Sequence, residues 1–162
     1  MIRGLRQDMS GSAAAEMALI LPLLLMLVLG TLEAGNLMWS QHKVTKAVRD
    51  GARYAARQNI ALLNCTTKDA TVESKIKLLT RTGQLASTTA TPKIVGWTDA
   101  AVTVTVACNA TYSAGIYTTL AGGAPVVTVA ASPNYRSLLG QLGLFSVGGK
   151  LRAEAKAPVM GI

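Results

Sequence analysis

An unbroken apolar run dominates the N-terminal part of the chain. Every residue from Met17 to Leu32 is uncharged, and most of them are strong helix formers. At about 1.5 Å of rise per residue, a helix over 12–32 is roughly 30 Å long, the thickness of one bilayer hydrocarbon core. The run therefore predicts a transmembrane helix, which Pro22 is expected to bend or loosen. Glu16 at the entrance of the run needs water or a partner, because a charge is unfavourable there.

The pattern changes after this run, and the helix is expected to continue as an amphipathic segment over 33–63. Apolar side chains recur there at steps of three and four residues, the spacing of one helix face. These positions are Leu37, Val44, Val48, Ala52 and Ala55. A second face is basic, with Lys46, Arg49, Arg53 and Arg57. One long helix over 12–63 is therefore predicted, with 12–32 as its membrane-spanning part.

Small residues form a row along the amphipathic segment at Ala47, Gly51 and Ala55. A glycine inside a helix costs about 1 kcal/mol relative to alanine, so Gly51 indicates that another backbone approaches the helix closely. The partner is either the chain's own sheet or a neighbouring subunit, and the sheet is favoured.

The remainder, 64–162, is predicted to be a globular α+β domain. A helix is expected from Lys68 to about Thr82, with Gly83 as its stop. Strict alternation predicts a strand over Ala101–Tyr112. Further expected elements are strands at Lys93–Trp97, Val126–Ala131 and Lys150–Ala157 and a short helix within Asn134–Leu142. The fold class is thus α+β, a long N-terminal helix packed on a small, mainly antiparallel β-sheet.

Two cysteines, Cys65 and Cys108, follow the apolar run. If that side of the membrane is oxidising, they can form a disulfide, which would stabilise the domain by roughly 3–4 kcal/mol. Cys108 alternates with the valines of its strand, so it is expected to face the core. The alternative is a pair of small buried thiols. Aromatic residues make up only 4% of the chain, so the core of this domain is expected to be built from small side chains. A disulfide cross-link would help to stabilise such a core.

Composition and charge narrow the range of functions. The chain has 16 Lys and Arg against 8 Asp and Glu, a net charge of +8. Because these charges are spread and few rings are available for base stacking, no nucleic-acid partner is expected. His42 is the only histidine, and the sequence has no phosphate-binding glycine loop, nucleophile elbow or spaced metal ligands. We therefore expect no enzyme, no catalytic residue, no metal and no cofactor.

Residues 1–11 form a polar leader that carries Arg3 and Arg6. Basic residues also follow the apolar run, so charge alone does not determine the orientation in a membrane. One interpretation of residues 1–34 is an ordinary signal peptide that is cleaved off during secretion. Against it, Glu16 intrudes before the apolar run, and the helical pattern continues past the poor cleavage site at 32–34.

The leader, its final glycine, the glutamate that follows and the apolar helix together resemble a type IV prepilin N-terminus. More specifically, the chain resembles the TadE/TadG-like pseudopilins of the tight-adherence (Tad, type IVc) pilus, over about residues 8–57. The segments that carry the resemblance are Gly11-Ser12-Ala13-Ala14-Ala15-Glu16-Met17-Ala18-Leu19, the leucine-rich run with Pro22, Glu33-Ala34-Gly35 and Val48-Arg49-Asp50-Gly51-Ala52-Arg53-Tyr54-Ala55-Ala56. Met17 stands where phenylalanine is commoner in the family, but methionine is an adaptable apolar residue, so processing is expected to survive.

The resemblance implies that a membrane-embedded prepilin peptidase cuts between Gly11 and Ser12, which makes 1–11 a cytoplasmic leader. It further implies a pilin-like, single-pass protein of the inner (cytoplasmic) membrane, with its N-terminus inside and 64–162 in the periplasm, that later enters the extracellular pilus. The implied partners are the prepilin peptidase, major and minor pilins, the inner-membrane pilus assembly platform and membrane lipid.

Cleavage would give Glu16 a partner. Ser12 would then carry a free ammonium, and the Glu16 carboxylate of one subunit could neutralise the amine of its neighbour and set their axial register. The simpler alternative is that Glu16 snorkels to the membrane interface.

The function expected from the resemblance is that of a minor pseudopilin in the initiation, tip or priming of a Tad pilus for adhesion and surface colonisation. The globular domain favours a minor component, because major subunits of this class are usually very short. Two alternatives are a minor pseudopilin of a type II secretion system and a membrane-anchored periplasmic interaction module that never enters a filament.

Overall fold

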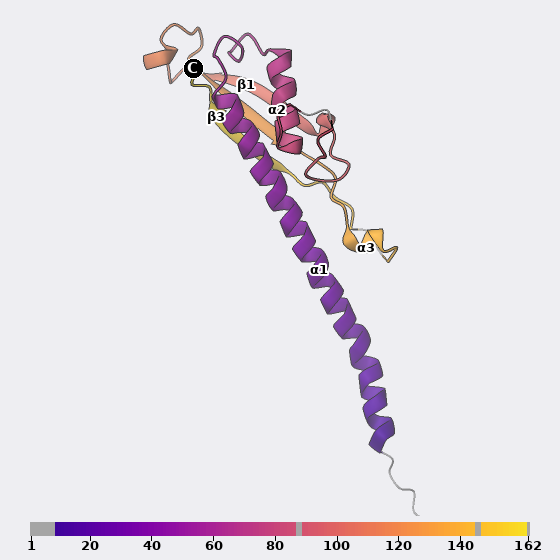
Figure 1. Ribbon diagram of the computed structural model, residues 1–162. Coiled ribbons are helices and arrows are strands. Elements are labelled where there is room, and N and C mark those ends of the chain that lie inside the picture. Colours follow the sequence, from indigo (N-terminus) through magenta and orange to yellow (C-terminus); the bar gives the residue numbers. More distant parts are fainter. Residues whose placement is uncertain (1–8, 87–88, 145–146, 162) are drawn as a thin grey trace, which may run out of the picture.

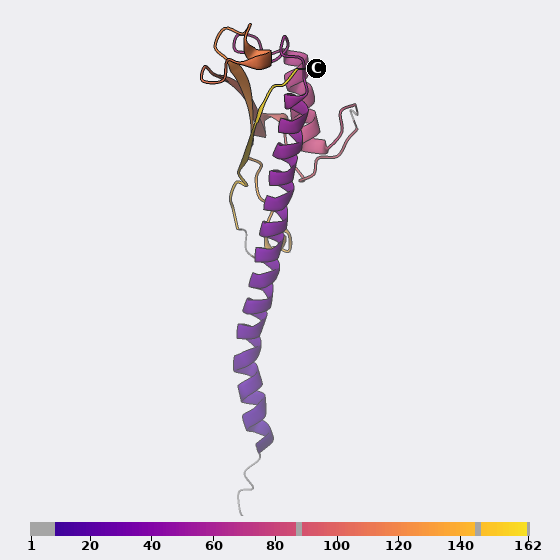
Figure 2. The ribbon, with the colours of Figure 1, turned by 90° about the vertical axis from the view of Figure 1, so that its left-hand side faces the viewer.

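The computed structural model describes residues 9–86, 89–144 and 147–161. Its dominant element is α1 (Met9–Ala56), a single helix of 48 residues. The C-terminal half of α1 packs on a small domain, and its N-terminal half projects from that domain as a rod (Figure 1, Figure 2). The predicted α+β fold, a long helix on a small antiparallel sheet, is confirmed.

Three strands form the sheet: β1 (Val102–Asn109), β2 (Ala124–Ala131) and β3 (Ala153–Pro158). They lie in the order β1-β2-β3, and both pairs are antiparallel. Val104 lies opposite Val129 across the first pair, so β-branched side chains meet on the buried face. The strict alternation in the sequence produces this geometry, because successive side chains in a strand point to opposite faces.

Both longer helices cover the same face of the sheet. The helix α1 packs against β2 and β3, whereas α2 (Ala70–Thr82) packs against α1 and β1. The core between these layers is built mainly from small and β-branched side chains. It includes Val44, Val48, Leu63, Ile76, Trp97, Val104, Val127 and Val129. The predicted stop of α2 is confirmed, since Gly83 caps it with a φ of 83°.

The long helix ends at Ala56, not near residue 63 as expected. Beyond it, the Asn59 side-chain oxygen accepts a hydrogen bond from the Ala61 amide at 2.8 Å, a local turn that competes with the helix. The Met160 amide donates to the Ala56 carbonyl at 2.9 Å and so occupies one of the last helical acceptors. The early end lets the chain reverse and bury Leu63 in the core.

The strand expected at Lys93–Trp97 is wrong. The segment turns, with the Trp97 amide donating to the Ile94 carbonyl at 3.1 Å and Gly96 at a φ of 80°. This turn directs Ile94 and Trp97 into the core together, which alternation along a strand would not do.

The helix expected within Asn134–Leu142 is shorter, because only α3 (Leu138–Gln141) is helical. Residues just before it pair with the start of the predicted last strand: the Tyr135 amide donates to the Gly149 carbonyl at 2.8 Å. Two further single turns are η1 (Asp99–Ala101) and η2 (Gly115–Tyr117).

Cys65 and Cys108 form a disulfide, with their Cα atoms 5.5 Å apart. The bond joins the segment after α1 to the end of β1. Of the two expectations for these residues, the disulfide is therefore the one that the structure bears out.

Gly51 lies where α1 packs closely on the rest of the domain. A Cβ atom placed on it would overlap the Thr80 hydroxyl on α2 and lie 3.5 Å from Cγ1 of Val129 on β2. Ala47 and Ala55 in the same row are fully buried. The close approach is therefore made within the chain, to α2 as well as to the sheet.

Gly51→Ala should lower the stability of the domain. The new methyl group must displace Thr80, whose hydroxyl is buried and donates to the Ile76 carbonyl at 2.7 Å. Overpacking of this kind costs about 1–3 kcal/mol, more than the helix propensity gained. Thermal unfolding of the detergent-solubilised protein measures the loss.

Gly35→Ala is the matched control, because nothing lies within 4 Å of a Cβ atom placed at Gly35 in the same helix. It should leave the melting temperature unchanged or raise it. The double variant Gly51→Ala/Thr80→Ala should recover part of the loss, and equal melting temperatures for all three variants would contradict the packing argument.

Candidate functional site

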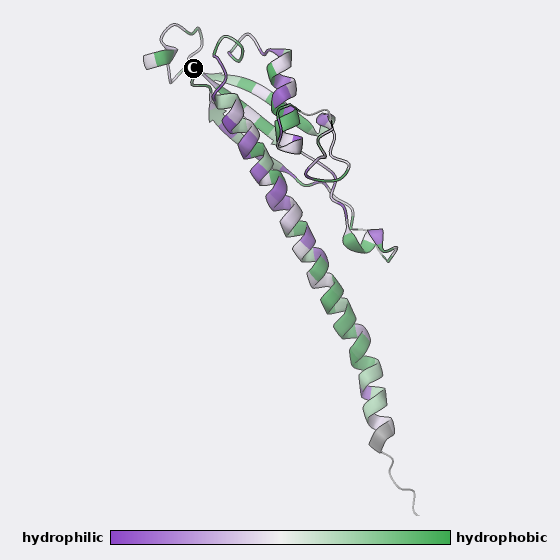
Figure 3. Cartoon of the chain, in the orientation of Figure 1, coloured by the Kyte–Doolittle hydropathy of each residue, from purple (hydrophilic) through white to green (hydrophobic). Residues whose placement is uncertain are grey.

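The candidate site is the projecting arm of α1, residues 11–32. Nearly all of its side chains are exposed, including large ones such as Leu19 at 79% and Met26 at 77%. Figure 3 shows this arm as a continuous hydrophobic surface. It is long and apolar enough to cross a membrane, and no other described helix meets that test. An apolar surface of this extent requires lipid or other protein around it.

Glu16 is the one carboxylate on the arm. It is exposed, and it makes no ion pair with any other residue that the structure describes. Gly11 and Ser12 lie in the first turns of α1, also exposed. The arginines of the leader, Arg3 and Arg6, lie outside the described residues. The arm therefore presents a lone acid within an apolar surface, close to the expected cleavage point.

Pro22 lies inside α1, and the helix continues through it. Proline removes one backbone donor and disturbs the preceding turn, so the helical hydrogen bonding is weakened at this point of the arm. Neighbouring helices or lipid can accept such a position.

The arm ends at a buried carboxylate, Glu33, which is 7% exposed. Its Oε1 accepts a hydrogen bond from the Tyr135 hydroxyl at 2.7 Å, and its Oε2 accepts one from the Leu139 amide at 3.1 Å. The carboxylate therefore ties α1 to α3 and to the segment before it. Asn36, one turn further along α1, supports the contact by donating to the Tyr135 hydroxyl at 2.8 Å.

Tyr135 is held as a donor in this contact. Burial of its ring, and then its hydrogen bond to the Glu33 carboxylate, raise the pKa of the Tyr135 hydroxyl. The proton is thereby kept on tyrosine, where it satisfies the buried acid.

Sequence reasoning placed Glu33 in a family-like segment but gave it no role. A signal was present: Glu33 falls on the same helix face as Val44 and Val48, which are both buried. A carboxylate on a buried stripe requires hydrogen-bond donors. Its donors, however, lie more than 100 positions away, and no local pattern identifies them.

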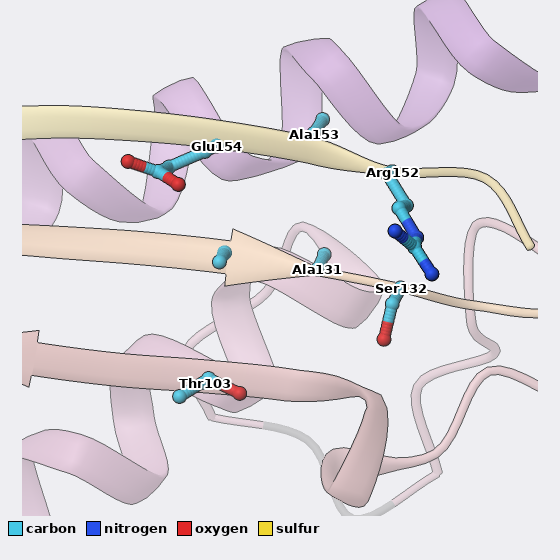
Figure 4. A pocket seen from close by; sticks show the side chains of 7 residues that line it. Thr103, Ala131, Ser132, Arg152, Ala153 and Glu154 are labelled. Carbon is cyan, nitrogen blue, oxygen red and sulfur yellow. The ribbon is translucent and has the colours of Figure 1, made fainter.

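Several hollows lie on the domain itself, of which two are relevant to possible chemistry. One, of about 360 Å³, is on the sheet face opposite the helices, where Arg152 extends toward Ser132 and Glu154 points away (Figure 4). The other, of about 530 Å³, lies beside α1 and is lined by His42, Arg49 and Lys150 among others. Ser132 and His42 thus line different hollows, so the only histidine is not positioned to activate that hydroxyl.

Metal ligands are likewise not gathered in the part of the chain that the structure describes: no group of three or more His, Cys, Asp or Glu side chains is placed to hold an ion. The basic positions Lys46, Arg49 and Arg53 on α1, and Arg57 just after it, are all exposed to solvent. We therefore take the exposed apolar arm as the candidate functional surface.

Comparison with known proteins points to the same segment. A family model described as "TadE-like protein" matches residues 11–53, which comprise the arm, Glu33 and most of the packed half of α1. The resemblance inferred from the sequence is therefore confirmed over these residues. No curated protein and no solved structure matches the chain.

Glu33→Ala should loosen α3 from α1. Alanine has no side-chain oxygen, so the buried Leu139 amide loses the acceptor that Glu33 provides. Leaving that buried amide unpaired costs about 1–3 kcal/mol. Hydrogen exchange of the Leu139 amide should therefore become faster by roughly one to two orders of magnitude.

Two controls accompany this measurement. Tyr135→Phe removes a donor but leaves the Leu139 bond in place, so its effect on the Leu139 amide should be smaller. Glu16→Ala, on the exposed arm, should have none. Unchanged protection in Glu33→Ala would show that the carboxylate does not hold α3.

Proposed function

Taking the TadE-like segment at 11–53 as the premise, we propose that this Tad pilus-associated protein is a minor pseudopilin. It is anchored in the inner membrane by the arm of α1 and takes part in the initiation, tip or priming of pilus assembly, for adhesion and surface colonisation. The TadE-like family is pilus-related and is not a family of enzymes. The observation that carries the proposal is the exposed apolar arm with one acid in it.

The arm suits a helix that exchanges lipid for neighbouring helices. In the membrane its leucines contact acyl chains, and in a pilus the same side chains would pack against other subunits without losing their apolar surroundings. The domain is fixed to the other half of the same helix and would be carried along on the outside of the filament. Its partners would be major and minor pilins and the membrane assembly platform.

Glu16 would fix the axial offset between neighbouring helices in this packing. A buried carboxylate is unfavourable alone, but one that meets the ammonium of a cleaved neighbouring subunit is compensated. Only one axial offset between subunits brings the two charges together. The exposure of Glu16 and the absence of an ion pair to any described residue leave it available for such a contact.

Cleavage of the leader by a prepilin peptidase is the first step of the proposed function, and it can be tested directly. The protein produced in membranes together with a prepilin peptidase should have an intact mass that corresponds to a chain starting at Ser12. Gly11→Val should block this cleavage, because the peptidase must accommodate the residue before the cut. The fold gives no reason for an effect, since nothing described lies within 4 Å of a Cβ atom at Gly11.

Gly30→Val is the matched control, on the same helix and with equally open surroundings. It should be processed like the unaltered protein. A functional protein that keeps its leader in cells would argue against a pseudopilin and in favour of a membrane-anchored module outside the filament.

Glu16→Ala should leave membrane insertion intact but prevent incorporation into pili. Removing the carboxylate leaves the neighbour's ammonium uncompensated in an apolar environment, a loss of about 3–5 kcal/mol for a buried pair. The measurement is immunogold labelling of sheared pili with a tagged copy. Labelling should fall to background while the amount of protein in the membrane is unchanged.

Glu154→Ala removes an exposed carboxylate from the domain and serves as the control. It should be labelled on pili like the unaltered protein. Normal incorporation of Glu16→Ala would mean that Glu16 merely reaches the membrane interface.

A further inference from the structure

We propose that the turn formed by α3 and the residues after it rests in the interfacial layer of the membrane, as a second contact beside the arm of α1. Leu138, Leu142 and Leu144 are the side chains that would enter the lipid. This inference rests on the membrane anchoring in the proposed function, and it adds a lipid-binding surface on the domain.

The position of the turn is set by Glu33. Leu32 is the last residue of the uncharged run, and Glu33 directly after it accepts the Leu139 amide of α3 at 3.1 Å. The turn is therefore held at the level where the apolar arm ends. Figure 1 shows α3 set apart from the sheet along α1, and Figure 3 shows it beside the start of the hydrophobic arm.

The turn presents apolar side chains to its surroundings. Leu142 is 71% exposed, Leu144 58% and Leu138 42%, whereas Leu139 between them is buried. No residue from Ser137 to Gly149 carries a charge. Such a cluster is unfavourable in water and favourable in the interfacial layer of a bilayer, into which apolar side chains transfer readily.

Basic residues bracket the apolar turn. Arg136 and Lys150 stand on either side of it, and both are exposed. The Arg136 carbonyl accepts a hydrogen bond from the Asn36 side chain at 3.1 Å, which places this arginine next to α1 just beyond Glu33. Cations at this depth face lipid headgroups and favour anionic ones.

The part of α1 that follows Glu33 also carries residues typical of a membrane surface. Trp39 is 62% exposed, and the Lys43 Nζ lies 5.3 Å from the centre of its ring. Tryptophan and lysine together are typical of a membrane–water interface. Because the turn is held against a helix that enters the membrane, at the level where its apolar arm ends, lipid is a better occupant of this surface than a second copy of the chain.

The test uses spin labels on the full chain in vesicles of phosphatidylcholine and phosphatidylglycerol. One label is attached at Leu142→Cys, and the native cysteines remain in their disulfide. The matched control is Ile116→Cys, an equally apolar position that is 59% exposed in η2 at the far end of the domain (Figure 1). A third label at Leu25→Cys reports on the arm.

The measurement is the accessibility of each label to oxygen, which concentrates in lipid, relative to a water-soluble nickel complex. The ratio at Leu142 should be several-fold higher than at Ile116 and lower than at Leu25. Equal ratios at Leu142 and Ile116, with Leu25 in the bilayer, would overturn the lipid contact and leave the anchoring intact. A water-exposed label at Leu25 would overturn both.

A second copy of the chain on the turn would give a different result. Labels at Leu142 would then broaden one another's spectra, and the broadening would disappear on dilution with unlabelled protein. That outcome would also overturn the proposal.

Discussion

The whole molecule depends on one constraint: a single continuous helix must satisfy two different surroundings. Over its first half α1 turns large apolar side chains outward, and over its second half it turns a row of small ones toward a sheet and a second helix. A helix of 48 residues is about 70 Å long, and it joins the arm to the domain with no loop between them. The position of the domain is therefore tied to the position of the arm.

Glu33 marks the boundary between these two regimes. It is a buried acid, satisfied by a tyrosine hydroxyl and a backbone amide from a distant part of the chain. At the other end of the packed half, the Ala56 carbonyl receives the Met160 amide, and the disulfide follows shortly after in the chain. The domain is thus fastened to α1 at both ends of their contact, which resists rotation about the helix axis.

Periodicity in the sequence accounts for most of the secondary structure, because it reflects local geometry. The alternation around Val104 and the three- and four-residue spacing through Val48 predict a strand and a helix that the structure confirms. The turn at Ile94–Trp97 and the early end of α1 were missed, because tertiary burial of Trp97 and Leu63 decides both.

The candidate site divides in the same way. The arm and Glu16 can be identified from the sequence pattern alone, because a charged residue directly beside a long apolar run is rare. The contact of Glu33 with Tyr135 spans 102 positions in the chain, and no pattern within either segment specifies it. Only the fold brings these residues together, and it does so at the point where the apolar arm stops.

The two faces of the sheet explain why assembly would use the arm and not the domain. Helices α1 and α2 cover one face, and the other carries Thr103, Thr105, Glu154 and Lys156, all exposed. Alternating charge of this kind on β3 discourages uncontrolled pairing with other sheets. Association through this polar face is therefore weakly favoured, whereas the arm needs apolar surroundings, which either lipid or other helices can provide. In the function proposed above, the protein would stay in lipid until other helices offer an equivalent environment, and the single carboxylate of Glu16 would then select among the possible registers.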